Sequence, residues 1–268
     1  MSTVTAVSPD GAAQLAIIGG TGFGELAGLV DMQAEIVVTP WGDAYIERGT
    51  LAGVPLLFLP RHGHPPRYPP HMINYRANIA ALAQLGIERI LAITAVGSVD
   101  PRLPPAAVVM PDQLIDYTWG RAQTFHDAEI QHIDFTYPYT ESLRQALLGA
   151  VAGLRARGEL LSFYPRGVYG CTQGPRLETA AEIARMARDG CSIVGMTAMP
   201  EAGLAREKGL AYAGLSVVVN AGAGINDQAV DLAAISAVMA RGMASVRQIL
   251  MALMLASAAQ EGSVTGPA

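Results

Sequence analysis

The sequence predicts an α/β fold: a single domain in which a mixed, largely parallel β-sheet is flanked by helices. Short apolar stretches of strand length alternate along the chain with amphipathic stretches of helical length. Several of the short stretches, among them residues 15–18 and 90–95, are apolar at almost every position. Such stretches are typical of parallel strands buried on both faces, so we expect helices to cover both faces of the sheet.

Turn signals and periodicity place the elements along the chain. Strands are predicted over residues 15–18, 35–38, 45–51, 55–59, 90–95, 161–169, 191–196 and 211–219. Helices are predicted over residues 74–85, 142–154 and 178–188, from Pro200 onward, and over 232–255. The polar and aromatic segment 116–134 has no regular pattern. A loop of this length inside a compact domain is usually functional or lies at an interface.

Length and composition indicate one domain that associates with other subunits. The 268 residues show no internal repeat and no Pro/Gly/Ser linker, so we expect one domain over 1–268 with loose tails at 1–13 and 259–268. Hydrophobic residues make up 51% of the chain, which is ample for a buried core. Only 15% of residues are charged, below the usual quarter, so we expect large surfaces to be hidden against other subunits.

Charge, apolar run length and cysteine usage argue against several classes of partner. The formal net charge is −5 and no basic cluster is present, so nucleic acid is not expected as a partner. The longest apolar runs, such as 249–256, are too short to span a bilayer, so no membrane is expected. Residues 1–13 lack a secretory pattern, and Cys171 and Cys191 lack metal-ligand spacing. We therefore expect free thiols, a cytoplasmic location, and neither a metal nor a cofactor.

The segment 194–202 joins an apolar strand to a predicted helix. Pro200 suits a first helical turn, where its missing N–H has no partner to lose. Thr197 offers a hydroxyl and a backbone N–H beside the positive end of that helix, which suits an anion. Glu201, just inside the helix, would lie within reach of a sugar. Thr197 could instead be only a structural cap.

Small polar or charged groups also follow five other predicted strands. In chain order they are Thr21, the pair Arg61 and His62, residues 94–98, residues 172–178, and Asn220. Because carboxyl ends of parallel strands meet at one edge of a sheet, we expect these groups to converge with Thr197. Arginine can clamp a phosphate through two N–H groups and histidine adds a donor, although the same pair could form a solvated basic loop. The glycine-rich turn at 19–22 matches neither dinucleotide nor P-loop signatures.

Six motifs together resemble one protein family. They are GGTG (19–22), RHGH (61–64), NYRANI (74–79), TAVGS (94–98), TQGPRLET (172–179) and GMTAMPEA (195–202). In order and spacing they resemble the trimeric purine nucleoside phosphorylases and methylthioadenosine phosphorylases over roughly residues 15–255. Within that family the chain is most similar to the bacterial methylthioinosine phosphorylase branch. The resemblance implies the nucleoside phosphorylase fold.

The resemblance also implies roles for individual residues. The implied phosphate-binding residues are Thr21, Arg61, His62, Thr94 and Thr197. The implied substrate-binding residues are Ala95, Glu178, Met196, Asn220 and His132, and the implied catalytic residues are Asn220 and His62. Met196 would pack under the sugar, and His132 would enter the site of a neighbouring subunit. A homotrimer is implied, with inorganic phosphate as a co-substrate and no cofactor.

The residue types at the implied base site favour a 6-oxopurine. Such a base has an N1–H donor and an O6 acceptor; ionised Glu178 only accepts, and Asn220 can donate to O6 or N7. Members of the family specific for adenine carry aspartates at the positions of Asn220 and Gly222. Ordinary nucleoside members place a histidine near the 5′-hydroxyl, whereas residues 232–235 contain none, which favours a methylthio group.

The resemblance implies phosphate-dependent cleavage of 5′-methylthioinosine to hypoxanthine and 5-methylthioribose 1-phosphate, a purine salvage reaction. Three alternatives remain at this point. Two are enzymes, a 6-oxopurine nucleoside phosphorylase for inosine and guanosine or a methylthioadenosine phosphorylase. The third is a nucleoside-binding module without turnover, against which a phosphate site argues.

Overall fold

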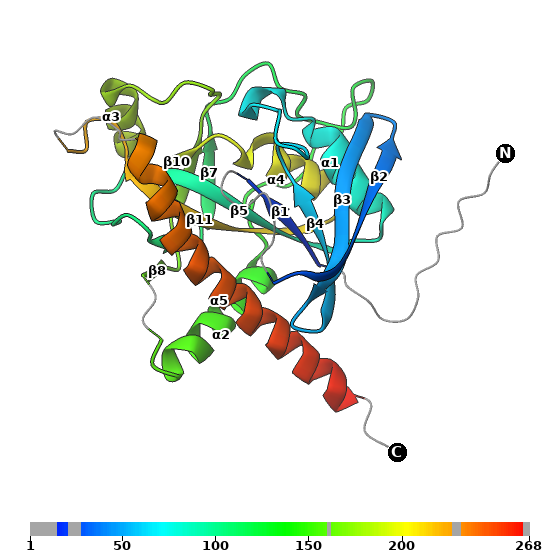
Figure 1. Cartoon of the computed structure of the whole chain (residues 1–268). Helices are drawn as coiled ribbons and strands as arrows, with labels where there is room; N and C mark the ends of the chain where they lie inside the picture. The colour runs from blue at the N-terminus through cyan, green and yellow to red at the C-terminus, as the bar shows by residue number, and fades with distance from the viewer. Residues whose placement is uncertain (1–14, 21–27, 160–161, 227–231, 265–268) are drawn as a thin grey trace.

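The computed structural model describes residues 15–20, 28–159, 162–226 and 232–264, and in these ranges eleven strands form one mixed sheet with helices on both sides (Figure 1). The strands are β1 Leu15–Gly19, β2 Val30–Thr39, β3 Gly42–Leu51, β4 Val54–Pro60, β5 Arg89–Ser98, β6 Val108–Val109, β7 Gln113–Asp116, β8 Phe163–Tyr164, β9 Val168–Cys171, β10 Ile193–Gly195 and β11 Ala211–Ala221. The helices are η1 Pro70–Met72, α1 Tyr75–Gln84, α2 Glu141–Ala156, α3 Ala180–Asp189, α4 Ala198–Glu207 and α5 Leu232–Val264. The predicted α/β fold class is confirmed.

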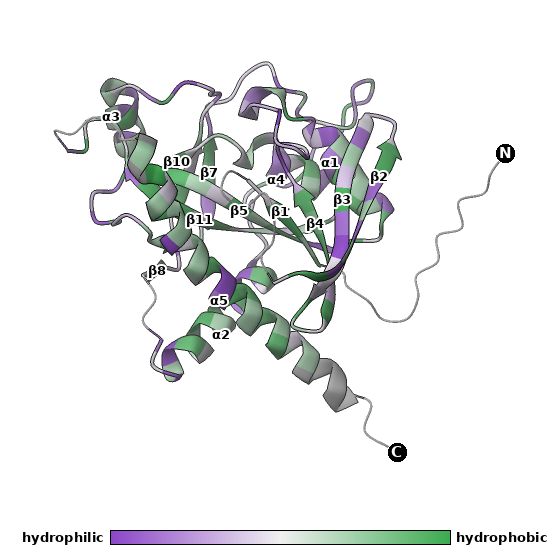
Figure 2. Ribbon diagram, viewed as in Figure 1, coloured by the Kyte–Doolittle hydropathy of each residue, from purple (hydrophilic) through white to green (hydrophobic). Residues whose placement is uncertain are grey.

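The central strands are buried on both faces because consecutive side chains enter different cores. Ala16 and Ile18 of β1 belong to the core cluster that contains α1 and α4, whereas Ile17 belongs to the one that contains α2 and α5. Strand β4 alternates in the same way. Figure 2 shows these strands as hydrophobic segments in the interior, and Figure 1 shows α2 and α5 together on one side of the sheet. The continuous apolar runs of the sequence therefore reflect burial on both sides.

The pairing of β5 leaves an opening in the middle of the sheet. Strand β11 occupies one edge of β5 from residue 89 to residue 98. On the other edge, β1 runs parallel to residues 89–92, and β10 runs antiparallel beside Gly97 and Ser98. Because β1 and β10 point toward each other, their carboxyl ends meet at residues 93–96 of β5. At this opening, backbone polar groups of β5 are available to other partners.

Two predicted elements differ from the structure. The apolar run 161–169, expected as one strand, holds all of β8 and the start of β9. Strand β8 pairs with β6, and β9 pairs with β7 and β10. Pro165 and Gly167 separate the two strands, in keeping with their role as turn residues. At the other end of the chain, α5 continues to Val264, into the segment 259–268 that was expected to be a loose tail.

Helix α5 contains a longer apolar segment than the run 249–256 that the sequence analysis considered. Its segment Ile235–Ala258 is long and apolar enough to cross a membrane by length and composition, and 44% of it is buried. Alanine, methionine and glycine interrupt the runs of larger residues without lowering the mean hydropathy much. The buried face of α5, including Val246, Ile249 and Leu250, packs against α2 and the sheet. A helix that packs in a protein core can have the same length and apolar composition as a membrane span.

Candidate functional site

Arg61 follows β4 and lies at the opening in the sheet, where its backbone N–H donates to Gly19 O at 2.8 Å. Its guanidinium is fully buried and paired with Glu201: Nε donates to Oε2 at 2.6 Å and Nη2 to Oε1 at 2.9 Å. Nη1 donates to the carbonyl of Ile93, in the stretch of β5 beside the opening, at 3.0 Å. A guanidinium has five N–H donors, so two remain beyond these three bonds. Burial lowers the pKa of Arg61, but Glu201 outweighs burial and raises it overall.

The sequence had indicated that Glu201 lies within reach of a sugar. In the structure its carboxylate is instead buried and paired with Arg61. Its side chain is buried, and its Oε1 also accepts from the Tyr212 hydroxyl at 2.9 Å. Paired charges of this kind are costly to separate in a protein interior. The pair fixes the guanidinium at the opening and directs the N–H groups that remain.

His62 stands beside Arg61 with one ring nitrogen committed to the backbone. Its Nδ1 lies 2.7 Å from the carbonyl of Tyr68, which only accepts, so Nδ1 carries the proton. Burial lowers the pKa of His62, which favours a neutral ring whose Nε2 is an acceptor. A Cβ at Gly20 would lie 2.8 Å from Arg61 Nη1 and 3.9 Å from His62 Nε2. Glycine thus lets the backbone after β1 approach both side chains.

Thr94 and Thr197 approach the opening from the two strands that border it. Thr94 is buried in β5, and its hydroxyl is 2.8 Å from the hydroxyl of Ser216 on β11. Thr197 follows β10 and holds the N-cap position of α4, but its side chain makes no capping hydrogen bond within the described residues. Met199 interrupts the helix with extended backbone because Pro200 disfavours a helical residue before it. A purely capping role does not account for the Thr197 hydroxyl.

Ala95 and Met196 lie between the phosphate-side groups and the predicted base site. Ala95 follows Thr94 in β5 and is half-buried. A Cβ at Gly174 would come within 2.5 Å of the Met196 sulfur, so the Met196 side chain lies directly against the segment that leads to Glu178. Met196 therefore connects the two predicted halves of the site.

Glu178 and Asn220 are both half-buried, and each retains hydrogen-bonding capacity. The Thr172 hydroxyl donates to Glu178 Oε1 at 2.6 Å, which leaves Oε2 as an acceptor. Asn220 donates through Nδ2 to the carbonyl of Ala221 at 2.7 Å. It follows a register shift between Val218 and Asn220 where β11 pairs with β5, and such bulges redirect side chains near binding sites. A small cavity of about 190 Å³ adjoins Glu178.

Three sequence predictions are not placed at the site. Thr21 lies outside the described residues. His132 is exposed in the loop between β7 and α2, and no hydrogen bond joins it to the other predicted residues within the described ranges. The predicted methylthio pocket involves the side chains of Leu232 and Ala234, which also lie outside the described set. Cys171 and Cys191 are free and buried, as expected.

Two residues of the site were missed by sequence reasoning, and a third was given a different role. Ser216 is an apolar-strand serine, Glu201 was assigned to a sugar, and Arg121 lies in a loop without periodicity. Their partners are distant in the chain, with 140 residues between Glu201 and Arg61 and 122 between Ser216 and Thr94. The length of the 116–134 segment, which marked it as functional, was the one available signal for Arg121.

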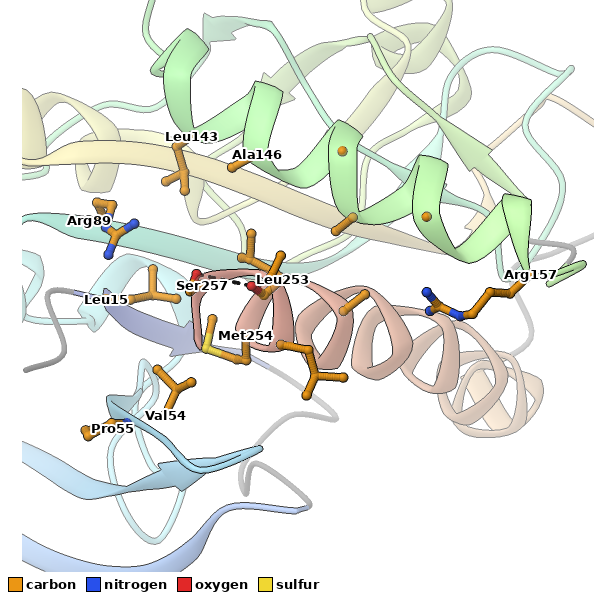
Figure 3. A pocket seen from close by; sticks show the side chains of 16 residues that line it. Leu15, Val54, Pro55, Arg89, Leu143, Ala146, Arg157, Leu253, Met254 and Ser257 are labelled. Carbon is orange, nitrogen blue, oxygen red and sulfur yellow. Dashed lines mark hydrogen bonds between the residues drawn. The ribbon is translucent and has the colours of Figure 1, made fainter. Parts of the chain in front are cut away.

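A larger cavity lies at the opposite edge of the sheet, away from the predicted site (Figure 3). It has a volume of about 560 Å³ and lies between α2, α5 and the amino ends of β1, β4 and β5. Leu15, Val54 and Leu253 are among its apolar lining residues, and Arg89 and Arg157 stand at its two ends. None of the residues that the sequence assigned to a site lines this cavity.

Comparison with known proteins agrees with the geometry. The chain matches the Phosphorylase superfamily over residues 14–254. It is 50% identical over 247 residues to the probable S-methyl-5'-thioinosine phosphorylase of Pseudomonas syringae pv. tomato, spanning 90% of this chain and 98% of the relative. It is 44% identical over 221 residues to the 6-oxopurine nucleoside phosphorylase of Pyrococcus furiosus, spanning 80% and 81%.

Solved structures give the same result for the fold. A methylthioadenosine phosphorylase from an antarctic soil metagenomic library superposes with a TM-score of 0.84 at 34% identity, over 93% of this chain and 88% of the other. The methylthioadenosine phosphorylase of Schistosoma mansoni in complex with adenine gives 0.85 at 30% identity, over 93% and 92%. The nucleoside phosphorylase fold implied by the motifs is confirmed.

Proposed function

Because this chain belongs to the Phosphorylase superfamily, we propose that it is a nucleoside phosphorylase that cleaves S-methyl-5'-thioinosine with phosphate. The products are hypoxanthine and 5-methylthioribose 1-phosphate, and the reaction serves purine salvage. The observation that carries the choice of a 6-oxopurine base is the pair Glu178 and Asn220, and the 50% identity to a probable S-methyl-5'-thioinosine phosphorylase supports the methylthio sugar. Glu178 keeps one carboxylate oxygen as an acceptor for N1–H, and the amide of Asn220 can donate to O6 or N7.

The opening beside residues 93–96 supports the placement of phosphate. Arg61 supplies its two remaining N–H groups, and Thr94 and Thr197 supply hydroxyls from the bordering strands. Neutral His62 presents Nε2 as an acceptor for the proton of hydrogen phosphate. Thr21, which adjoins this region in sequence, is assigned to the same group. Because Glu201 already neutralises Arg61, the site binds the anion mainly through directed hydrogen bonds.

The proposed reaction needs no covalent intermediate with the protein. A phosphate oxygen attacks C1′ of the sugar while the C1′–N9 bond breaks and its electron pair passes to the purine. The proton of hydrogen phosphate balances the N–H gained by hypoxanthine. Asn220 stabilises the negative charge that develops on the base, and Met196 packs under the oxocarbenium-like sugar, next to Ala95. Hydrogen bonds preorganised around developing charge are usually the largest catalytic contribution.

A second candidate is a general 6-oxopurine nucleoside phosphorylase that uses inosine and guanosine. It uses the same Glu178 and Asn220 pair, and the similarity to the Pyrococcus furiosus enzyme favours it over an adenine-specific activity. Gly222 further disfavours the adenine branch, because a Cβ there would lie 2.7 Å from the Ser98 carbonyl and 3.1 Å from Ile183. The backbone after β11 therefore has no room for an aspartate without rearrangement.

The assembly proposed with this function is a homotrimer in the cytoplasm, without a cofactor, nucleic acid or membrane partner. Strand β2 lies at an edge of the sheet, and its Ile36 and Val38 are 58% and 72% exposed, which favours burial against another subunit. His132 is exposed and free to reach a neighbouring site. Light scattering of the purified chain gives its mass, and loss of activity in His132→Ala without change of mass supports the shared site.

The test of the function is a comparison of four substrates with and without phosphate. The substrates are methylthioinosine, inosine, methylthioadenosine and adenosine. We expect cleavage only when phosphate or arsenate is present, with the highest kcat/KM for methylthioinosine. Phosphate-independent loss of the base would rule out phosphorolysis, and higher kcat/KM for inosine would favour the second candidate.

A further inference from the structure

Arg121 occupies the loop between β7 and α2 and contacts two segments of the candidate site at once. Nη1 donates to the carbonyl of Met196 at 2.8 Å and also to that of Met199. Nη2 donates to the carbonyls of Gln173 and Thr172 at 2.8 and 3.2 Å. The first pair of carbonyls flanks Thr197, on the phosphate side, and the second pair precedes Glu178, on the base side.

These bonds begin where the backbone pairing of β9 and β10 ends. The last backbone bond between the two segments joins Thr172 N to Gly195 O at 2.8 Å. Beyond it the chains diverge, one toward Glu178 and the other toward Thr197. Partly buried carbonyls need donors at such a point, and Arg121 supplies them in place of a backbone ladder.

The guanidinium of Arg121 is saturated by this arrangement. Nε donates to the side-chain oxygen of Gln173 at 3.2 Å, so all five N–H groups have acceptors. The guanidinium also lies 5.6 Å from the ring centroid of Tyr75, a cation–π contact that helps fix its plane. With no N–H left over, Arg121 has no donor for phosphate or for the nucleoside, and it acts through the segments that it holds.

We propose that Arg121 is a positioning residue that sets the spacing between the base-binding and phosphate-binding halves of the site. This inference rests on the function proposed above. The planar fork with five donors is essential to it, because a lysine ammonium has three donors and cannot reach four carbonyls on two diverging segments. Displacement of reacting groups by about 1 Å costs on the order of 100-fold in rate, so loss of the fork affects turnover without removing a contact to substrate.

The experiment compares Arg121→Ala and Arg121→Lys with a matched control, Arg166→Ala. Arg166 is 80% exposed and its nearest carboxylate oxygen, on Asp112, lies 3.7 Å away. We expect both Arg121 variants to fold, to show raised KM values for phosphate and for methylthioinosine, and to lose roughly 10- to 100-fold in kcat/KM. Added guanidinium ion restores activity to Arg121→Ala but not to Arg121→Lys, whose side chain fills the site. Arg166→Ala keeps wild-type constants.

Two outcomes would overturn the inference. One is a folded Arg121→Ala protein with wild-type KM for both substrates. The other is an apparent kcat that falls only by the fraction of protein that is unfolded, with KM unchanged and no rescue by guanidinium. If wild type itself cleaves none of the four nucleosides, the proposed function fails separately. In that case the rise of the unfolding temperature with inorganic phosphate still tests Arg121: the inference requires a smaller rise in Arg121→Ala than in wild type, and an equal rise contradicts it.

Discussion

The two ends of the central strands differ in how their polar groups are used. Beyond the carboxyl ends of β4 and β10, charged and polar side chains form a buried network, of which Arg61 and Glu201 are the centre. At the amino ends of β1, β4 and β5, Leu15 and Val54 line an apolar cavity, and Arg89 stands at its rim. The larger cavity is at the end that holds none of the predicted site residues. The candidate site is therefore marked by convergent polar groups with directed hydrogen bonds and not by cavity volume.

The largest expected effect is the difference between removing an arginine at the carboxyl ends of the strands and removing one at their amino ends. Arg61→Ala leaves Glu201 buried without its charge partner and takes donors from phosphate, so we expect a loss of about 3–5 kcal/mol in stability and at least roughly 100-fold in kcat/KM for phosphate. Arg89→Ala, at the exposed rim of the opposite cavity, should stay within about 0.5 kcal/mol of wild type. Urea unfolding and phosphate kinetics measure both. Wild-type phosphate dependence in Arg61→Ala would disprove its assignment to the phosphate site.

The next largest effect is expected on the choice of base, which we assign to Glu178 and Asn220. Wild type should favour methylthioinosine over methylthioadenosine by about 10-fold or more in kcat/KM, because the lone pair of adenine N1 opposes Glu178. The double variant Glu178→Ser with Asn220→Asp should shift this ratio toward methylthioadenosine. Adding Gly222→Asp, as the adenine branch would suggest, is expected to destabilise the protein because a Cβ clashes with the Ser98 carbonyl. Equal use of both substrates by wild type would show that Glu178 and Asn220 do not read the base.

A smaller effect is expected from Ser216, which reaches the site only through Thr94. Ser216→Ala removes the 2.8 Å hydrogen bond that orients the Thr94 hydroxyl. We expect KM for phosphate to rise by about 3- to 10-fold, the scale of one buried hydrogen bond, with kcat for methylthioinosine little changed. Ser257→Ala in α5, whose hydroxyl bonds the Leu253 carbonyl at the opposite cavity, is the control and should leave KM unaltered. An unchanged KM for phosphate in Ser216→Ala would show that the hydrogen bond from Ser216 does not orient Thr94 for phosphate binding.

The smallest effect is a gain in stability at the opposite edge. Gly149 lies inside α2 beside the large cavity, and an added Cβ would meet no atom within 4 Å among the described residues. Gly149→Ala should therefore raise the free energy of unfolding by about 0.5–1 kcal/mol while leaving kcat and KM unchanged. Thermal unfolding and steady-state kinetics check this. A loss of activity would mean that this cavity contributes to function after all.

Local sequence patterns were sufficient for most of the fold. The apolar runs at 15–18 and 90–95 became β1 and β5, and Asn74 caps α1 through Ala77 N, at the predicted start of that helix. The run 161–169 failed because apolar content marks burial but does not specify which neighbours a strand pairs with. The length of α5 was underestimated because alanine and methionine are compatible with a long helix as well as with a frayed end.

By itself the sequence determined the chemical groups of the candidate site and the strand ends that carry them. The positions of Arg61, His62, Thr94, Thr197 and Asn220 follow from local order, because each lies close to the end of an apolar run, whereas Glu178 follows its run after a short polar segment. Six short motifs in a fixed order were enough to indicate the family. Motifs of this kind indicate a family without a structure because their residue types, order and spacing can be read from the chain alone.

Only the tertiary structure decided how these groups are connected. It paired Arg61 with Glu201 across 140 residues, opened β5 between the ends of β1 and β10, and placed Arg121 between two diverging segments. It also left no room for a side chain at Gly222. Such contacts join residues that have no periodic relation along the chain. Their existence depends on strand order and register, which the packing of the whole sheet fixes and no local pattern encodes.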